Sequence, residues 1–261
     1  MKNVMLLYWG SLLGCINNTK LENNTHLDSG DLAENQTIDE PAHTDTNTLF
    51  SIDTTFGQIS QIDPTDGSTI SIGSISTDYE ISSMALNQDG VAYIYDHFNH
   101  KIGLFDPCSG ELDLRPIANE EYVICGISFM PNGSLYGIDS KNNLLVQYNL
   151  ETGEAISIGS LNMNIRACGL AYDSTSGQLV GATGSTGEIF NIDINTGDTL
   201  NHLSTDVPFE SVGVEYDQST DTLIVSTGNT LYSVDLMDGT ATQLGVMEGH
   251  VDDLIFHEKC Q

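Results

Sequence analysis

Three acidic residues near the C-terminal end of the sequence, Glu215, Asp252 and Asp253, are the side chains best suited to chemistry. Each lies in or beside a short apolar run of the kind that forms a strand. Carboxylates that converge can hold a divalent cation or act as an acid and a base during hydrolysis. One hypothesis is therefore a metal-dependent hydrolase or lactonase that uses these carboxylates with a divalent cation. Against this hypothesis, the three residues do not recur at one repeated position. The chain has 37 acidic residues, so several would fall near the inner strands by chance.

Aromatic side chains form a second group of candidates. Tyr79, Tyr122 and Phe209 each stand five residues before the equivalent position of a later apolar run. They could form a rim that stacks on a sugar or holds a peptide. The same rings could instead fill gaps between structural units, and this structural role is the one we favour.

A histidine-bearing loop extends this candidate rim. Residues 96–101 carry His97, Phe98 and His100. Two histidines beside an aspartate could bind a metal ion, but solvated histidines are commoner on loops. We keep the three side chains as part of the candidate rim and predict no metal ion there.

The charge balance excludes several classes of partner. The 261 residues include 7 Lys and Arg against 37 Asp and Glu, which gives a formal net charge of −30. A chain this acidic, without a basic cluster, is a poor partner for DNA, RNA or anionic lipid surfaces. The sequence also lacks the GxSxG, HExxH, GxGxxG and P-loop patterns. We therefore expect an unidentified protein or glycan as the partner, and no nucleic acid.

A five-residue turn pattern recurs five times and indicates the elements that must position these residues. Its copies begin 43, 43, 44 and 42 residues apart. The copies are DPTDG (63–67), DPCSG (106–110), NLETG (149–153), DINTG (193–197) and DLMDG (235–239). Alternating apolar runs flank each turn and two more apolar runs precede it, so each unit holds four short strands. A period of about 40–45 residues with several strands is typical of a β-propeller blade.

The repeated region starts and stops at different strands of the repeat unit, and this offset predicts how a ring of blades closes. Residues 48–53 match the second strand of a unit, whereas residues 251–256 match the innermost strand. The last strand can therefore complete the first blade and remove exposed sheet edges. We predict an all-β, five-bladed propeller over residues 48–261, built from four-stranded antiparallel blades.

Short polar residues close the second strand of every unit. Asp53, Asp96 and Asp139 hold this position in three units, and we place Thr183 and Ser226 there in the other two. Such side chains accept hydrogen bonds from backbone N–H groups of the next turn. We assign these five residues a structural role.

These repeats resemble those of secreted bacterial propellers with degenerate sequences, of the YVTN, NHL and Kelch-like kinds. The resemblance covers residues 48–261. It implies the architecture, and it transfers no catalytic residue, because no motif with known catalytic positions matches this chain.

The first residues resemble the signal of a bacterial lipoprotein. The apolar stretch from Val4 to Leu13 follows a lysine and is too short to span a bilayer. LLGC (12–15) resembles the lipobox, which implies removal of residues 1–14 and attachment of lipid, including palmitate, to Cys15. Because the next residue is not aspartate, the resemblance implies the outer membrane or cell surface, with the lipid as the only membrane contact. Residues 16–47 are polar and acidic, and we expect a disordered tether.

Four cysteines remain for disulfide bonds, which persist in exported proteins. Cys125 and Cys168 share one phase of the innermost strand in neighbouring units. Cys108 lies in a turn, and Cys260 follows the closing strand. We predict the pairs Cys108–Cys260 and Cys125–Cys168, and we consider zinc less fitting because the sequence has no CxxC spacing.

Three hypotheses for the function follow from these observations. The first is a lipid-anchored, exported propeller that acts as a non-catalytic binding or protein-interaction module and needs no cofactor. The second is the metal-dependent hydrolase or lactonase with carboxylates at the channel. The third is a structural envelope protein that associates with itself.

Overall fold

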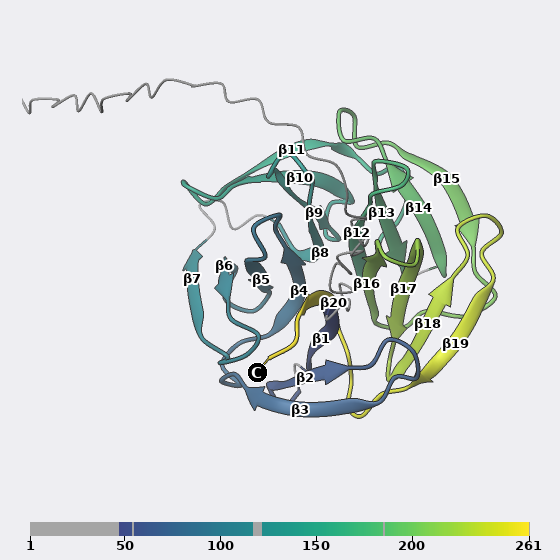
Figure 1. The fold of residues 1–261 in the computed structure, drawn as a ribbon. Coiled ribbons are helices and arrows are strands. Elements are labelled where there is room, and N and C mark those ends of the chain that lie inside the picture. The colour runs from purple at the N-terminus through teal and green to yellow at the C-terminus, as the bar shows by residue number, and fades with distance from the viewer. Residues whose placement is uncertain (1–46, 54, 117–121, 185, 261) are drawn as a thin grey trace, which may run out of the picture. The chain divides into compact units, whose positions relative to one another are not determined.

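The propeller predicted from the repeat is the fold of this chain. The computed structural model describes residues 47–53, 55–116, 122–184 and 186–260, and within these ranges it holds twenty β-strands and no helix. The strands form five antiparallel sheets of four strands each. The sheets stand around a common axis as the five blades of a β-propeller (Figure 1).

Each blade runs outward from one inner strand, and we number the blades from the one that the chain enters first. Blade 1 consists of β20 (Leu254–Glu258), β1 (Asn47–Asp53), β2 (Gln58–Ile62) and β3 (Thr69–Ser74). Blade 2 consists of β4 (Ile81–Leu86), β5 (Ala92–Asp96), β6 (Lys101–Phe105) and β7 (Leu112–Pro116). Blade 3 consists of β8 (Ile124–Phe129), β9 (Leu135–Asp139), β10 (Leu144–Asn149) and β11 (Glu154–Ser160). Blade 4 consists of β12 (Cys168–Asp173), β13 (Gln178–Thr183), β14 (Glu188–Ile192) and β15 (Thr199–Ser204). Blade 5 consists of β16 (Val212–Asp217), β17 (Thr222–Thr227), β18 (Thr230–Val234) and β19 (Ala241–Val246).

The two ends of the folded region close the ring in blade 1, as the sequence predicts. β20 pairs antiparallel with β1, with Phe256 opposite Leu49 and Leu254 opposite Ser51. The inner strands β20, β4, β8, β12 and β16 contact one another in turn and return to β20. Every inner strand therefore has a sheet partner on one edge and the axis on the other (Figure 1).

The recurring five-residue turn joins the two outer strands of each blade. In its first copy the Asp63 carboxylate accepts a hydrogen bond of 2.8 Å from the Thr65 N–H, and the Gly67 N–H donates to the Asp63 carbonyl at 2.9 Å. Gly67 has a φ of +73°, and a Cβ there would stand 3.0 Å from the Gly245 backbone of blade 5. The turn therefore needs glycine both for its backbone conformation and for close contact with the neighbouring blade.

The polar residues that end the second strands have the structural role that the sequence predicts, with one correction. Asp96 accepts a hydrogen bond of 3.1 Å from the Glu80 N–H, and Asp139 accepts one of 2.8 Å from the Val123 N–H. These bonds tie the entry of each inner strand to the turn after the second strand. In blade 5 the prediction of Ser226 is wrong: the position belongs to Thr227, whose Oγ1 accepts from the Glu210 N–H at 2.9 Å.

The register explains this correction. Thr227 pairs with Val212, the first residue of β16, as Thr183 pairs with Cys168, the first residue of β12. Ser226 lies one residue earlier in β17, opposite Gly213, where its hydroxyl accepts from the Gly213 N–H at 3.2 Å.

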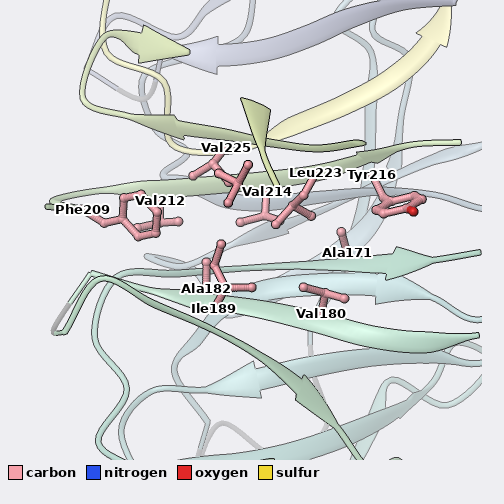
Figure 2. Packing of buried hydrophobic residues seen from close by; sticks show 11 residues of the cluster. Ala171, Val180, Ala182, Ile189, Phe209, Val212, Val214, Tyr216, Leu223 and Val225 are labelled. Carbon is pink, nitrogen blue, oxygen red and sulfur yellow. The ribbon is translucent and has the colours of Figure 1, made fainter. Parts of the chain in front are cut away.

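The hydrophobic core lies between the faces of neighbouring blades. Figure 2 shows the layer between blades 4 and 5, where alanine, valine and isoleucine side chains of blade 4 face aliphatic and aromatic side chains of blade 5. The labelled residues are Ala171, Val180, Ala182, Ile189, Phe209, Val212, Val214, Tyr216, Leu223 and Val225. Burial of apolar surface stabilises such a layer by roughly 25 cal/mol for each Å² removed from water.

Two disulfide bonds join the cysteines in the predicted pairs. Cys108 bonds to Cys260 with Cα atoms 5.4 Å apart, and it links the outer turn of blade 2 to the segment after β20. Cys125 bonds to Cys168 with Cα atoms 5.1 Å apart, and it links the inner strands of blades 3 and 4.

The predicted signal with Cys15 and the tether up to residue 46 lie outside the described residues. Within the described residues, no helix offers the length and apolar character needed to cross a bilayer.

Candidate functional site

A ring of small residues and one aspartate narrows the centre of the propeller. One residue from each inner strand, or directly before it, occupies equivalent positions, and we call this set the axial ring. Its members are Ser83, Gly126, Gly169, Gly213 and Asp253. A Cβ on Gly169 would stand 2.8 Å from the Val214 nitrogen, and one on Gly213 would stand 2.8 Å from the Asp253 Cα. At these two glycines the inner strands meet the neighbouring strand so closely that a side chain would clash.

The Asp253 carboxylate joins three blades at this ring. Its Oδ2 accepts hydrogen bonds from the Ser83 hydroxyl at 2.6 Å and the Met84 N–H at 2.7 Å. Its Oδ1 accepts from the Leu254 N–H at 2.9 Å and from the Val214 N–H at 3.4 Å. The residue is 2% exposed, and burial raises the pKa of its carboxyl to about 7 although the four donors act to lower it.

The axial ring separates two cavities. On one side, a cavity of about 1050 Å³ opens among the turns that join inner and second strands, and we call it the axial cavity. On the other side, where the inner strands begin, a small pocket of about 130 Å³ is lined by residues that precede the axial ring, among them Ser82, Cys125 and Asp252.

A collar of apolar and mainly aromatic side chains surrounds the axial cavity. Each inner strand contributes one residue that lies three positions after its member of the axial ring. In all five blades this residue pairs with the corresponding residue of the second strand. These residues, the collar, are Leu86, Phe129, Tyr172, Tyr216 and Phe256. Tyr172 and Phe256 are half-buried, whereas Tyr216 is 4% exposed and Phe129 is 7% exposed. The sequence prediction missed this set, although its aromatic members recur at intervals of 43, 44 and 40 residues.

Glu215 lies between the axial ring and the collar and lines the axial cavity. Its Oε1 accepts a hydrogen bond of 2.9 Å from the Tyr216 N–H. Burial raises the pKa of this carboxyl to about 8, and the nearby charges of Asp253 and Asp217 act in the same direction. The equivalent residues of blades 2 and 3 are the small Ala85 and Ser128, which leave room for the glutamate. Glu215 keeps some exposed surface because it faces the cavity, unlike Asp253.

The three acids expected to converge lie in three different places. Glu215 lines the axial cavity, Asp253 lies in the axial ring, and Asp252 lines the small pocket on the other side. Asp252 accepts a hydrogen bond of 2.9 Å from the Ser211 hydroxyl and lies 3.2 Å from the Nε2 of His250. Among the described residues, no three His, Cys, Asp or Glu side chains are grouped closely enough to hold a metal ion.

The aromatic residues of the candidate rim lie between blades. Phe209 is 4% exposed and belongs to the core layer of blades 4 and 5 (Figure 2). Tyr79 and Tyr122 are half-buried and pack against the apolar clusters that involve blades 2 and 3. None of the three lines the axial cavity or the small pocket.

The histidine loop lies at the turn between β5 and β6. The rings of His97 and His100 have centroids 6.4 Å apart, and the Nδ1 of His100 lies 3.2 Å from the Tyr95 hydroxyl. Phe98 is 72% exposed. The loop is remote in the fold from the axial cavity, because it follows a second strand at the opposite end of the blade from the collar.

The fold and the cavity define a five-bladed β-propeller with an axial cavity. Solved structures are similar to it as β-propellers. No protein-family model and no curated protein matches the chain. A chain of a nidogen/laminin complex matches with a TM-score of 0.56 and 14% identity, over 80% of this chain and 97% of that chain. A Bacteroides thetaiotaomicron protein of unknown function matches with a TM-score of 0.52 and 12% identity, over 79% of this chain and 65% of that chain.

A catalytically inactive virginiamycin B lyase from Staphylococcus aureus, solved with quinupristin, is a third similar structure. It matches with a TM-score of 0.51 and 16% identity, over 82% of this chain and 79% of that chain. At such identities the similarity shows the β-propeller fold and nothing about the activity.

We predict that the free energy of unfolding falls as the pH rises from about 4 to about 8. Glu215 and Asp253 have pKa values raised to about 8 and about 7, above their ordinary values of 4.5 and 3.8. The folded state therefore holds protons that the unfolded state has released. This stabilisation is complete below the ordinary pKa values and is lost as the pH rises through the raised ones. Because one pKa unit corresponds to about 1.4 kcal/mol, each carboxyl contributes up to about 4–5 kcal/mol.

Urea unfolding at pH 5, 7 and 9 measures this effect. The Glu215→Gln variant should show a weaker pH dependence than the wild type, because it cannot ionise at that position. Glu154→Gln, at an exposed glutamate of β11, is the matched control and should follow the wild type. An equal pH dependence of the free energy of unfolding in the wild type and Glu215→Gln would contradict the prediction.

Proposed function

We propose that this protein is an exported binding module that holds a small ligand in the axial cavity. The observation that carries the proposal is the cavity itself, about 1050 Å³ in volume and surrounded by the collar. Ligand sites in proteins are concave, mostly apolar, and carry a few polar groups that orient the ligand. Here Asn87, Gln88 and Ser219 supply such groups at the mouth, and Glu215 supplies one in the interior.

Solved propellers support a binding role without deciding it. Similar structures include a chain of a nidogen/laminin complex and a lyase solved with quinupristin. The fold thus occurs in proteins that bind other proteins and in enzymes. For this chain the cavity is the feature that favours binding.

The setting that we propose is a lipid anchor on the outer membrane or cell surface, in a propeller of the secreted YVTN, NHL or Kelch-like kind. The lipobox-like LLGC (12–15) supports the anchor at Cys15. The two disulfide bonds support export, because such bonds persist in oxidising compartments. Palmitate labelling of the wild type and of a Cys15→Ser variant tests the anchor, which would be disproved by equal labelling.

A thermal-shift screen of the full chain with glycans, small organic molecules and metal ions tests the cavity. A ligand that binds only the folded state raises the melting temperature by mass action. We expect at least one compound to do so, and we expect Tyr172→Ala to reduce the shift because this residue lines the cavity. Phe56→Ala removes an aromatic side chain that is 71% exposed on a turn away from the cavity, and this control should keep the shift. A screen without hits, or hits indifferent to Tyr172→Ala, would refute the proposal.

A hydrolase is the second candidate, and one observation favours it. A carboxyl with a pKa of about 8 holds its proton at neutral pH and can serve as a general acid, and Glu215 is such a group inside a cavity. In that case Glu215 would act without Asp252, which lies on the other side of the axial ring. Hydrolysis of ester or lactone substrates that is abolished in Glu215→Gln would support this candidate over binding alone.

A further inference from the structure

The axial cavity has carboxyl groups, ionised at alkaline pH, that no basic residue of its lining compensates. Its lining includes Glu215 and Asp217, and Asp253 lies directly behind Glu215. None of the described lysine, arginine or histidine residues lines the cavity or forms an ion pair with Glu215. The whole chain adds to this field with its formal net charge of −30. Such a field repels anionic ligands and raises the local concentration of cations.

The collar offers the second feature that a cation needs. Aromatic rings attract positive charge through their negative faces, and more strongly where water is excluded. Tyr172 and Phe256 line the cavity with half-buried rings, whereas Phe129 and Tyr216 stand at the same level with rings that are almost fully buried between blades. Glu215 lies one residue deeper than this level, so a ligand past the collar reaches its carboxylate.

The donor set fits an organic cation better than a metal ion. In the described part of the chain, no three His, Cys, Asp or Glu residues come together as metal ligands. The cavity is also wide, at about 1050 Å³, and its wall at the collar is aromatic, whereas metal sites need several oxygen, nitrogen or sulfur atoms converging within about 2–2.6 Å. Rings around a carboxylate are instead the arrangement that binds amines and quaternary ammonium groups.

We propose that the axial cavity binds an organic ammonium cation, with the charged nitrogen held between the Glu215 carboxylate and the rings of the collar. This inference rests on the proposed binding function and names its ligand class. A neutral ligand that accepts a hydrogen bond from protonated Glu215, such as a sugar, is the competing occupant that the experiment must separate.

Calorimetry with choline and its neutral isostere 3,3-dimethylbutan-1-ol, on the full chain at pH 8, tests the proposal. The two probes have the same shape and differ in charge. Choline should bind at least ten-fold more tightly, and Glu215→Gln should abolish this preference. Glu210→Gln, at an exposed glutamate before β16 on the other side of the axial ring, is the matched control and should keep it. Tyr172→Leu should weaken choline binding several-fold, whereas Tyr172→Phe keeps the ring and should retain most of the affinity.

The pH dependence supplies a readout that depends on the charge of Glu215. The titratable groups that act on the Glu215 carboxyl are Asp217 on the same strand and Asp253 before β20. Binding of a cation requires the ionised carboxylate, so choline affinity should rise between pH 6 and pH 9 with release of a proton near pH 7. A neutral ligand bound to the protonated carboxyl would weaken over the same range.

The possible outcomes separate this inference from the proposed function. Equal affinity for choline and its isostere, or a choline preference that survives Glu215→Gln, would overturn the cation site. If choline fails but another compound gives a shift that Tyr172→Ala removes, the cation site is wrong and the binding function stands. If no compound of any class binds in the cavity, both proposals fall.

Discussion

Replacement of Asp253 by alanine should lower the free energy of unfolding by roughly 3–5 kcal/mol. The substitution removes the acceptor of the Ser83 hydroxyl, the Met84 N–H and the Leu254 N–H, all of them buried at the axis. A buried donor left without a partner costs about 1–3 kcal/mol. The loss also spreads, because the Ser83 oxygen that Asp253 orients accepts the Ile127 N–H of blade 3 at 2.7 Å.

Urea unfolding at pH 6 measures this loss, with the neighbouring aspartate as the control. Asp252→Ala removes a carboxylate that is partly exposed in the small pocket and should cost about 1 kcal/mol or less. Asp253→Asn keeps one acceptor oxygen and should fall between the two alanine variants. A cost for Asp253→Ala no larger than that for Asp252→Ala would show that the carboxylate does not hold the ring together.

Removal of the disulfide bond between Cys108 and Cys260, by serine at both positions, should have the second largest effect. The bond closes a loop of 152 residues, for which the chain-entropy model gives about 5 kcal/mol, and losses of about 2–5 kcal/mol are typical of native bonds. The bond also fixes the segment after β20, the strand that completes blade 1. The double variant should therefore unfold at a lower urea concentration, by roughly 2–5 kcal/mol in free energy.

The other disulfide bond is the internal standard for this measurement. Cys125–Cys168 spans 43 residues, for which the same model gives about 4 kcal/mol, and its removal should cost less than removal of Cys108–Cys260. The reverse order, or peptide mapping without reduction that recovers other pairs, would contradict the assignment. Both double variants should keep the fold, since either one leaves the other bond intact.

The architecture could be predicted from the sequence because it rests on local signals that repeat. The turn that begins at Asp63 recurs at nearly constant intervals, and each copy uses its first residue, Asp or Asn, and its glycine for the same hydrogen bonds and backbone conformation. The out-of-phase ends predicted the pairing of β20 with β1, and the shared phase of Cys125 and Cys168 predicted their bond.

The candidate site could be predicted only in part, because it depends on which end of each inner strand faces a cavity. Tyr79 and Phe209 repeat as regularly as the collar, yet they pack between blades, whereas Tyr172 and Phe256 line the axial cavity. The sequence shows the period of both sets but not the depth at which the axial ring divides the channel. That depth is set by Gly169, Gly213 and Asp253, whose contacts involve residues from different blades.

The wrong assignment of Ser226 to the position of Thr227 has a simpler cause. In blades 4 and 5 the last residue of the second strand lies opposite the first residue of the inner strand. This pairing identifies Thr227 as the equivalent of Thr183, whereas alignment of the apolar runs does not.

The completion of blade 1 by β20 makes closure of the ring depend on a strand from the far end of the folded region. Without β20, β1 has no inner neighbour and exposes an unpaired backbone edge. A prematurely terminated product that lacks residues 253–260 would lose the closing strand, the Asp253 carboxylate and the Cys260 thiol together. One octapeptide therefore couples a sheet edge, a buried hydrogen-bond acceptor and a covalent link, so that all three form or fail together.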